Sequence, residues 1–570
     1  MMTLRIARSR EALLALLVLA GTVALSACAP PTLTSLDRTS GPGHTLVMAQ
    51  GSNLIFSRII WDAGLATEQV IPGGFLGGYM YSVPPGATLG NHPVALANSR
   101  GRSGTINFNV TAPQPYGAPR IDYVMIGAAS FDTSGNVNAW LYVQGANIDV
   151  GAVVQVNGTD VATAAHKGLR NDLYGIPPNA LGYPIYHYLA LLALPGAQPV
   201  GSTLSLTVRN LDGQVSPAFS YRLPADAATL DSDGDDLPDA WETAGYDANG
   251  DGTIDVNLPA LGANQHRRDV FLEIDVMTGL ANPPVATTPG NPGTFDMARA
   301  MFAAAPIINP GPNNGINLII DSSGTVPFVN IVGFSAADNA VLGTANYSTI
   351  KAANFDNANR GRIYHYAIWA NAQPGGFSGI SDIQFNAAGQ VTGPGDDFIV
   401  SFDDFAAAFQ TLRSQVETLT HEFGHNLGQQ HGGNNNNTLK PNYWSVMSYA
   451  WQLRTGRSNA VRRQRVTCTP AYYAVAGATE PNGALPAVVN AVVDYSEGMA
   501  ASLVENNNSL NETTGVCGLP VDWNNDGDQT DVGINADVDD DGNNTSTVTD
   551  FANWRALDLR GPRLNGSVAP

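Results

Sequence analysis

The stretch "HEFGHNLGQQHGG", His421–Gly433, holds three of the chain's nine histidines beside one glutamate. His421 and His425 are four residues apart, so on a helix they lie on one face, one turn from each other. Gly428 favours the end of a helix, because glycine readily adopts the left-handed backbone conformation found there. A turn at this point would bring His431 back toward the other two histidines. The stretch therefore predicts a helix that ends at a cluster of three histidines.

The residues ahead of this stretch predict which side of the helix is buried. Apolar residues recur at every third or fourth position, so on a helix they form a single stripe suited to packing on a sheet. His421 lies about 200° around the helix from Leu419, so we expect the histidines to point away from the stripe and toward a cleft. The stripe comprises Phe405, Phe409, Leu412, Val416, Leu419, Phe423 and Leu427.

Three histidines with one nearby carboxylate suit a catalytic zinc site. Zinc takes neutral imidazole nitrogens at about 2.0–2.1 Å in a tetrahedral array that leaves one position for water. His421, His425 and His431 are the predicted ligands of one zinc ion. Glu422 is the predicted general base, placed to take a proton from the metal-bound water.

The full pattern His-Glu-x-x-His-x-x-Gly-x-x-His, followed by "SVMSY" (Ser445–Tyr449), resembles the metzincin family of zinc endopeptidases. The resemblance implies that Met447 forms a tight turn below the metal. It also implies that Tyr449 ligates zinc and stabilises the oxyanion, as in astacin-like and serralysin-like members. From the residues alone, Met447 could be an ordinary core residue and Tyr449 an ordinary buried tyrosine.

The resemblance is specific over the zinc helix and the methionine turn, and covers residues 268–431 only as a general layout of strands and helices. "DVFLEIDVM", "GINLIID" and "IYHYAIWA" read as strands, and "TFDMARAMFAAAP" reads as a helix. The family fold implies a cleft in which substrate lies extended along an edge strand. "DDFIVSF" (Asp396–Phe402) is the candidate for that strand.

Length and composition indicate a multidomain exported protein. A chain of 570 residues is too long for one domain. Its 60 glycines and 36 prolines, with only 14% charged residues, favour many short strands and turns. The net charge of −21 argues against nucleic acid as a partner, since phosphates need a basic surface.

The N-terminus reads as a targeting segment. Residues 1–27 join a basic start to the apolar run "ALLALLVLAGTVAL" and end in "LSAC", Leu25–Cys28, which resembles the bacterial lipobox. This predicts a signal peptide, a lipidated Cys28 and a linker over residues 28–36; an ordinary cleaved signal is the alternative. We expect the protein to be anchored at the outer membrane or surface of a bacterium, or released, and to touch membrane only through this anchor.

Cys468 and Cys517 are the only other cysteines. In an oxidising compartment an isolated pair is more often a disulfide than a metal site, so a disulfide is the favoured interpretation.

Two β-modules are predicted ahead of the catalytic domain. Residues 37–113 resemble the immunoglobulin-like IPT/TIG module, and "TINFNV" (residues 105–110) has the alternation of a strand. Residues 117–224 form a second β-sandwich candidate, with "VVQVNG" and "LSLTVRN" as strands. We interpret both as stalk or spacer rather than as ligand sites, although a role in substrate binding stays open.

An acidic segment, residues 226–260, predicts bound calcium with a structural role. Acids at positions 1, 3, 5, 9 and 12 match the oxygen ligands of an EF-hand loop, although Asp236 replaces the usual glycine at position 6. A second loop fits through position 9 but has Leu258 at position 12. A solvated turn and a regulatory EF-hand are the weaker alternatives. The tentative ligands are Asp231, Asp233, Asp235, Asp239 and Glu242 in the first loop, and Asp247, Asn249, Asp251 and Asp255 in the second.

Similar Asp/Asn-rich loops recur near the C-terminus, in "DWNNDGD" (Asp522–Asp528) and "DVDDDGN" (Asp537–Asn543). We predict that these loops also bind calcium. They fall within the last predicted domain, residues 265–570. The predicted fold class is therefore multidomain: Ig-like β-sandwich modules, then a metzincin-like α/β domain with a mixed twisted sheet and a zinc helix.

The leading functional interpretation is a zinc metalloendopeptidase that hydrolyses peptide bonds of extracellular proteins. One alternative is a surface adhesin with an inactive protease fold; a dead copy would commonly have lost Glu422 or a histidine, and all are present. Another is a zinc hydrolase acting on a substrate other than protein, against which the methionine turn argues.

Overall fold

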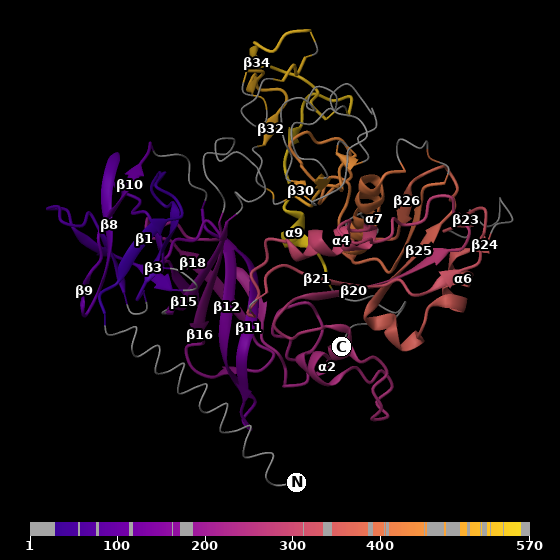
Figure 1. The fold of residues 1–570 in the computed structure, drawn as a ribbon, viewed down its shortest axis with the longest axis horizontal. Helices are drawn as coiled ribbons and strands as arrows, with labels where there is room; N and C mark the ends of the chain where they lie inside the picture. The colour runs from indigo at the N-terminus through magenta and orange to yellow at the C-terminus, as the bar shows by residue number, and fades with distance from the viewer. Residues whose placement is uncertain are drawn as a thin grey trace. The chain divides into compact units, whose positions relative to one another are not determined.

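The fold is described from a computed structural model (Figure 1). The predicted signal peptide (residues 1–27), Cys28, Phe409, Cys468 and Cys517 lie outside the described residues. The structure describes residues 29–54, 57–75, 79–112, 118–161, 163–170, 186–311, 313–334, 345–385, 391–403, 405, 410–449, 451–452, 472–474, 491–496, 498, 502–513, 515, 521–524, 526–539 and 541–559.

The chain divides into two compact units. The first holds most of the residues up to Leu223, and the second holds the chain from Pro224 onward together with Met125–Phe131. The first unit is built from strands. The second combines strands with helices and contains the histidine cluster.

The first β-module of unit 1 has two facing sheets, ordered β1-β3-β7-β6 and β2-β10-β8-β4-β5, with β9 paired to β8. Alternate residues enter the core between them, as Phe108 and Val110 of β10 do. Thr32–Leu36 were expected in a linker but form β1, because they pair antiparallel with β3. The strands are β1 (Thr32–Leu36), β2 (Ser40–Gly41), β3 (Leu46–Ser52), β4 (Arg58–Trp61), β5 (Gln69–Ile71), β6 (Gly73–Phe75), β7 (Tyr79–Ser82), β8 (Gly90–Asn98), β9 (Gly101–Arg102) and β10 (Ile106–Val110).

The second β-module also has two sheets, ordered β11-β12-β16-β15, with β17 paired to β12, and β14-β13-β18-β19. Both strands predicted here are confirmed, because β13 and β18 pair antiparallel and bury alternate residues. The strands are β11 (Arg120–Phe131), β12 (Asn136–Ala146), β13 (Val153–Val156), β14 (Thr159–Val161), β15 (Thr163–Arg170), β16 (Tyr186–Ala193), β17 (Gln198–Pro199), β18 (Thr203–Arg209) and β19 (Phe219–Arg222).

Unit 2 is organised around a mixed sheet of order β21-β20-β25-β29-β26, with the short β22 (Thr325–Val326) beside β20. β20 (Asp269–Met277), β21 (Asn317–Asp321), β25 (Tyr364–Ala370) and β29 (Asp397–Ser401) are parallel. β26 (Gly379–Ser381) ends this path and runs antiparallel to β29. The strand predictions for this region are confirmed, but β29 lies between β25 and β26. The prediction that it is the edge strand is therefore wrong.

Side chains of the mixed sheet alternate between two covered faces. On β25, His365 and Trp369 face α4 (Thr294–Ala303) and α7 (Leu412–Asn426), where they contact Phe423 and Phe295. Tyr366, one residue along, points to the opposite face, against α6. Both faces are covered, which explains why β25 is buried along its whole length.

The remaining elements of unit 2 are short. They are α2 (Asp239–Ala244), α3 (Leu258–Leu261), β23 (Val332–Gly333), β24 (Ala345–Asn346), α6 (Tyr347–Asn354), η2 (Ala358–Arg362), β27 (Gln384–Phe385), β28 (Val391–Gly393), β30 (Tyr472–Ala474), β31 (Ala491–Val493), β32 (Leu503–Val504), β33 (Leu510–Asn511), β34 (Val532–Ile534), β35 (Thr547–Val548) and α9 (Asn553–Ala556).

The protein is thus a β-rich multidomain chain, as predicted. Within the residues that the structure describes, no helix is both long enough and apolar enough to cross a membrane.

Candidate metal centre

Helix α7 carries the candidate site and begins later than the apolar stripe predicts. Thr411 is extended and its hydroxyl accepts the backbone N–H of Ser414, which caps the helix before Leu412. Phe405, the first residue of the stripe, lies outside the helix and packs on Phe402 instead. A periodic run of apolar residues cannot reveal where the helix starts, because a loop can also bury them.

The structure brings the three histidines together. Nε2 of His421 lies 3.2 Å from Nε2 of His425, and each of the three histidines has a ring nitrogen within 4.8 Å of the others. Two nitrogens bound to one tetrahedral zinc ion would lie ~3.3 Å apart. The observed spacing therefore fits a single zinc ion.

Backbone carbonyls fix the orientation of two of these rings. His421 donates its Nδ1–H to the carbonyl of Val446 at 2.9 Å, and His425 donates its Nδ1–H to the carbonyl of Gln429 at 2.7 Å. The protons are thereby held on Nδ1, which leaves the Nε2 lone pairs facing the shared space. Burial lowers the pKa of His425 to about 4 and that of His431 to about 3, so both rings are neutral at physiological pH.

The three histidines, predicted to point toward a cleft, differ in exposure. His421 is 2% exposed, whereas His425 and His431 are half-buried. The stripe argument placed His421 away from Leu419, but it could not show that the segment around Val446 covers that side of the helix.

Helix α7 ends at Asn426, and Gly428 completes a Schellman motif at its C-terminus. Gly428 has φ +83°, its N–H donates to the carbonyl of His425, and the N–H of Gln429 donates to that of Gly424. A tight turn follows, in which Gln430 and Gly433 exchange backbone hydrogen bonds. His431 lies within this turn. Its position depends on the left-handed backbone conformation of Gly428, three residues earlier.

Glu422 lies at the boundary between α7 and the end of the sheet. Its side chain is buried, and burial raises its pKa to about 8. A methyl group at Gly379 of β26 would lie only 2.4 Å from Oε1 of Glu422. A side chain at this position would therefore force the Glu422 side chain to shift. Sequence reasoning missed Gly379, because no local pattern links it to a helix more than forty residues away.

Met447 lies in a turn against helix α7. The N–H of Ser448 donates to the carbonyl of Ser445, and Met447 is fully buried. A methyl group at Gly424 would lie 2.4 Å from Sδ of Met447, so the small residue between the histidines lets the turn approach. Tyr449 leaves this turn toward the histidines. Its ring centroid is 4.4 Å from that of His431 and 5.7 Å from that of His421.

Residues near the C-terminus hold the end of α7. Gln429 donates to the carbonyl of Ala556 and accepts a hydrogen bond from Asn553, both at 2.9 Å. Asp558 donates its N–H to the carbonyl of Leu427. These partners were not predicted, because polar residues this far apart carry no sequence signal.

The first acidic loop forms a buried carboxylate cluster. Two overlapping groups share Asp235: one with Asp231 and Asp233, the other with Glu242 and Asp269. Burial and repulsion from neighbouring carboxylates raise the pKa of Glu242 to about 11, and burial raises that of Asp269 to about 6. Both carboxylate oxygens of Asp233 and of Glu242 are buried without a hydrogen-bond partner among the described residues. This arrangement suits a hard cation.

Two features of this cluster differ from the prediction. Asp239 does not join it but caps the loop, accepting from the N–H and the hydroxyl of Ser232. Asp269, the first residue of β20, joins it without having been predicted. Asp236, at the position where glycine is usual, adopts φ +75°.

The second acidic loop does not gather its side chains around a common point among the described residues. Asp247 accepts the N–H groups of Gly250 and Gly252, Asp251 accepts that of Thr253, and Asp255 accepts that of Ala248. Asn249 donates to Asp251. The carboxylates stabilise the turn through these bonds, and the second set of calcium ligands stays a prediction.

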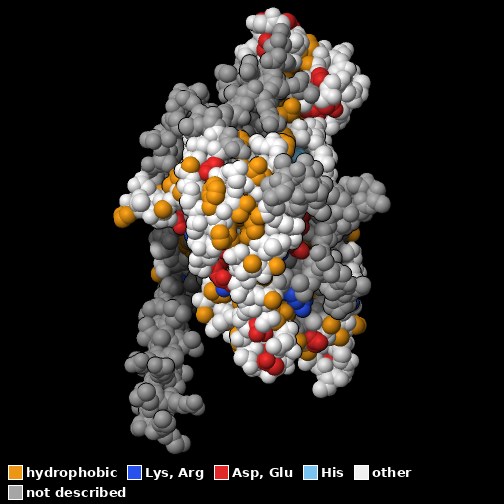
Figure 2. Space-filling model, turned by 90° about the vertical axis from the view of Figure 1, so that its right-hand side faces the viewer, with side chains coloured by type: hydrophobic (Ala, Val, Ile, Leu, Met, Phe, Trp, Pro, Cys, Tyr) orange, Lys and Arg blue, Asp and Glu red, His pale blue; other side chains and the backbone are white. Residues whose placement is uncertain are grey.

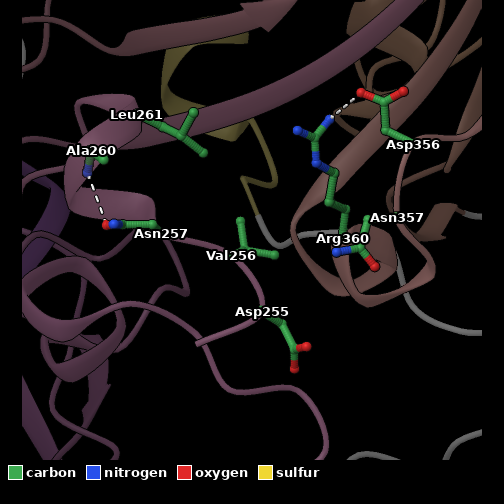
Figure 3. A pocket seen from close by; sticks show the side chains of 8 residues that line it. All are labelled: Asp255, Val256, Asn257, Ala260, Leu261, Asp356, Asn357 and Arg360. Carbon is green, nitrogen blue, oxygen red and sulfur yellow. Dashed lines mark hydrogen bonds and ion pairs between the residues drawn. The ribbon is translucent and has the colours of Figure 1, made fainter. Parts of the chain in front are cut away.

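A pocket of about 380 Å³ lies apart from the histidines, between the segment around α3 and η2 (Figure 3). Arg360, on its rim, is held by ion pairs to Glu273, Asp321 and Asp356. These pairs make the rim rigid, and the lining brings no metal-ligand group together. We assign this pocket no catalytic part.

No family model and no curated protein matches this chain. Among solved structures, γ-cyclodextrin glucanotransferase from alkalophilic Bacillus clarkii is 11% identical and covers 34% of this chain and 26% of its own, at a TM-score of 0.13. SGBP-B from a xyloglucan utilization locus of Bacteroides uniformis is 13% identical. The match covers 36% of this chain and 52% of that protein, at a TM-score of 0.13. The plexin A4 extracellular region is 10% identical. The match covers 34% of this chain and 18% of that protein, at a TM-score of 0.15. The chain thus spans only part of each, and similarity at this level supports no conclusion about function.

Proposed function

We propose that the protein is a zinc-dependent endopeptidase acting on extracellular proteins. The observation that carries the proposal is the convergence of His421, His425 and His431. Glu422, whose side chain is buried, directly follows His421 in the sequence. The zinc ion would supply a Lewis acid that polarises a carbonyl group and lowers the pKa of a water molecule toward 7.

The chain's own residues would perform the remaining steps. Glu422 would accept a proton from the attacking water on a carboxylate oxygen and deliver it to the leaving nitrogen. Its raised pKa suits this exchange, while a divalent cation on the neighbouring histidines would favour the ionised form at the start. The phenol of Tyr449 lies beside the histidine rings, where it could donate to a developing oxyanion.

Strand β26 replaces β29 as the proposed substrate-binding strand. It ends the path of the mixed sheet, and its Gly379 lies against Glu422. An extended peptide pairing with its outer side would place a peptide bond close to the general base. The antiparallel β26, the zinc helix and the turn at Met447 together support membership of the metzincin family, which we also propose.

The proposal is tested by metal content and cleavage of an unfolded protein. The purified protein should hold about one histidine-bound zinc. Glu422→Gln should keep the zinc and lose about 10²–10⁴-fold in kcat. His431→Gln should lose zinc, whereas His266→Gln, a matched change at an exposed histidine, should not. Wild-type protein that holds zinc but cleaves no protein would favour the inactive adhesin instead.

We further propose that the cluster of Asp231, Asp233, Asp235, Glu242 and Asp269 binds calcium with a structural role. The support is its buried, unpaired carboxylate oxygens. Because Asp269 begins β20, calcium would fasten the acidic loop to the mixed sheet. Chelation should lower the melting temperature without removing zinc; an unchanged melting temperature would contradict the assignment.

Export and lipid anchoring through Cys28 are proposed from the sequence alone. Metabolic labelling with a radioactive fatty acid should mark the wild-type protein but not Cys28→Ser. Labelling of both would show that Cys28 is not the modified residue.

A further inference from the structure

The two Asp/Asn-rich loops near the C-terminus are structural repeats fifteen positions apart. In the first, Asp522 accepts the N–H groups of Asp526 and Gly527; in the second, Asp537 accepts those of Asp541 and Gly542. Each loop thus folds around its first carboxylate. Figure 2 shows acidic side chains gathered at the top of the view, over the segment that carries β32 and β34 in Figure 1.

Each loop is joined by a fully buried glutamate from outside it. Glu512 accepts the N–H of Trp523 at 2.7 Å, and Glu505 accepts that of Val538 at 2.8 Å. Glu505 also accepts the N–H and hydroxyl of Ser546. These bonds leave the glutamates beside the loop carboxylates rather than in solvent.

The second loop has the features of a cation site. Oxygens of Glu505, Asp537 and Asp539 lie within 4.8 Å of one another. Asp539 is 1% exposed, and its Oδ1 has no hydrogen-bond partner in the described part of the chain. In the first loop the corresponding group, Glu512 with three aspartates, is mostly exposed. The second loop is therefore the stronger candidate, since buried like charges without a cation are costly.

Asp539 also reaches the segment that follows the zinc ligands. Its Oδ2 accepts a hydrogen bond from the side-chain amide of Asn437. Asn435, two residues earlier, accepts the N–H of Gly432 at its carbonyl, and Lys440 donates to the carbonyl of Gly432 at 2.8 Å. Gly432 is the neighbour of His431. The N–H of Asn437 donates to Oδ1 of Asn435 at 3.1 Å, so hydrogen bonds connect the second loop to Gly432, the residue that follows the third histidine.

We propose that Glu505, Asp537 and Asp539 form a calcium site that, through Asn437, orders the loop carrying His431. All-oxygen donors and a loop of alternating acids before a glycine favour calcium over zinc. The site itself is independent of the proposed protease function; its effect on zinc retention rests on that function. Calcium bound at Asp539 would hold Asn437 in place and slow the opening of residues 431–440.

The test begins with zinc-free protein, so that it does not depend on the protease proposal. Calcium binding is counted by equilibrium dialysis with calcium chloride, and backbone hydrogen exchange is followed over residues 431–440. Asp539→Asn should bind one calcium fewer than wild type. Asn437→Ala should weaken that calcium by about 10- to 100-fold, as loss of a partner of a ligating carboxylate does.

Two controls separate the steps. Asn436→Ala alters an exposed asparagine in the same loop and should leave calcium affinity and exchange unchanged. Asp233→Asn should remove calcium from the other acidic cluster and leave exchange over 431–440 calcium-dependent. Unchanged stoichiometry in Asp539→Asn would overturn the site. Equal effects of Asn436→Ala and Asn437→Ala would overturn the link to the histidine loop.

A final arm uses zinc-loaded protein. Calcium should slow the transfer of zinc to a coloured chelator in wild type but not in Asp539→Asn. If calcium protects residues 431–440 in the zinc-free protein but the wild type binds no zinc, the calcium site stands and the proposed protease function fails.

Discussion

Replacement of Gly379 by alanine tests the placement of Glu422, the proposed general base, without changing Glu422 itself. The new methyl carbon would lie 2.4 Å from both Cγ and Oε1 of Glu422. An ordinary contact begins at 3.4 Å, so the carboxylate must move by about 1.0 Å. A displacement of about 1 Å at a catalytic group can cost ~10²-fold in rate, equivalent to about 2.7 kcal/mol of transition-state stabilisation.

The assay is kcat/KM on a quenched fluorescent peptide, with zinc content and melting temperature measured on the same samples. Gly379→Ala should retain zinc and lose about 100-fold in kcat/KM. Gly104→Ala, where the added methyl group meets nothing within 4 Å, is the matched control and should match wild type. A Gly379→Ala protein with full zinc and wild-type kcat/KM would refute the placement of Glu422 against β26.

Three further predictions concern stability. Gly424→Ala should lower the melting temperature, since overpacking against Met447 costs about 1–3 kcal/mol; unaltered thermal unfolding would contradict that contact. Gly428→Ala should lower the free energy of unfolding, measured in urea, by about 1–2 kcal/mol, because a φ of +83° is strained for an L-residue. A loss below a few tenths of a kcal/mol would mean that the turn changes conformation and removes the strain. In chelator, the protein should lose stability as pH rises from about 5 to about 8. The raised pKa values of Glu242 and Asp269 mean that the fold favours their protonated forms, and calcium should flatten this dependence. Melting curves at pH 5 and pH 8, with and without calcium, show whether stability falls as pH rises.

Local sequence patterns predicted the elements of unit 2 well. β20 and β25 were found because each is a continuous buried run with β-favouring residues. Gly428 was found because its left-handed conformation is a property of one residue. In each case the determining physics lies within a few neighbouring residues.

The parts that were missed depend on contacts between distant segments. Gly379 matters only because Glu422 lies against it, and Asp269 joins the acidic cluster only because β20 begins beside that loop. The mistaken choice of β29 as edge strand has the same origin. Its sequence shows that it is a buried strand, but strand order depends on which neighbours pair with it.

The hydrogen bonds from Gln429 to Asn553 and Ala556 join positions 124 and 127 residues apart. The turn that presents His431 is thus completed by nearly the last segment of the described chain. During synthesis, this support cannot form until that segment has emerged. The order of emergence would then itself delay assembly of the histidine centre, and truncation before Asn553 would leave its support incomplete.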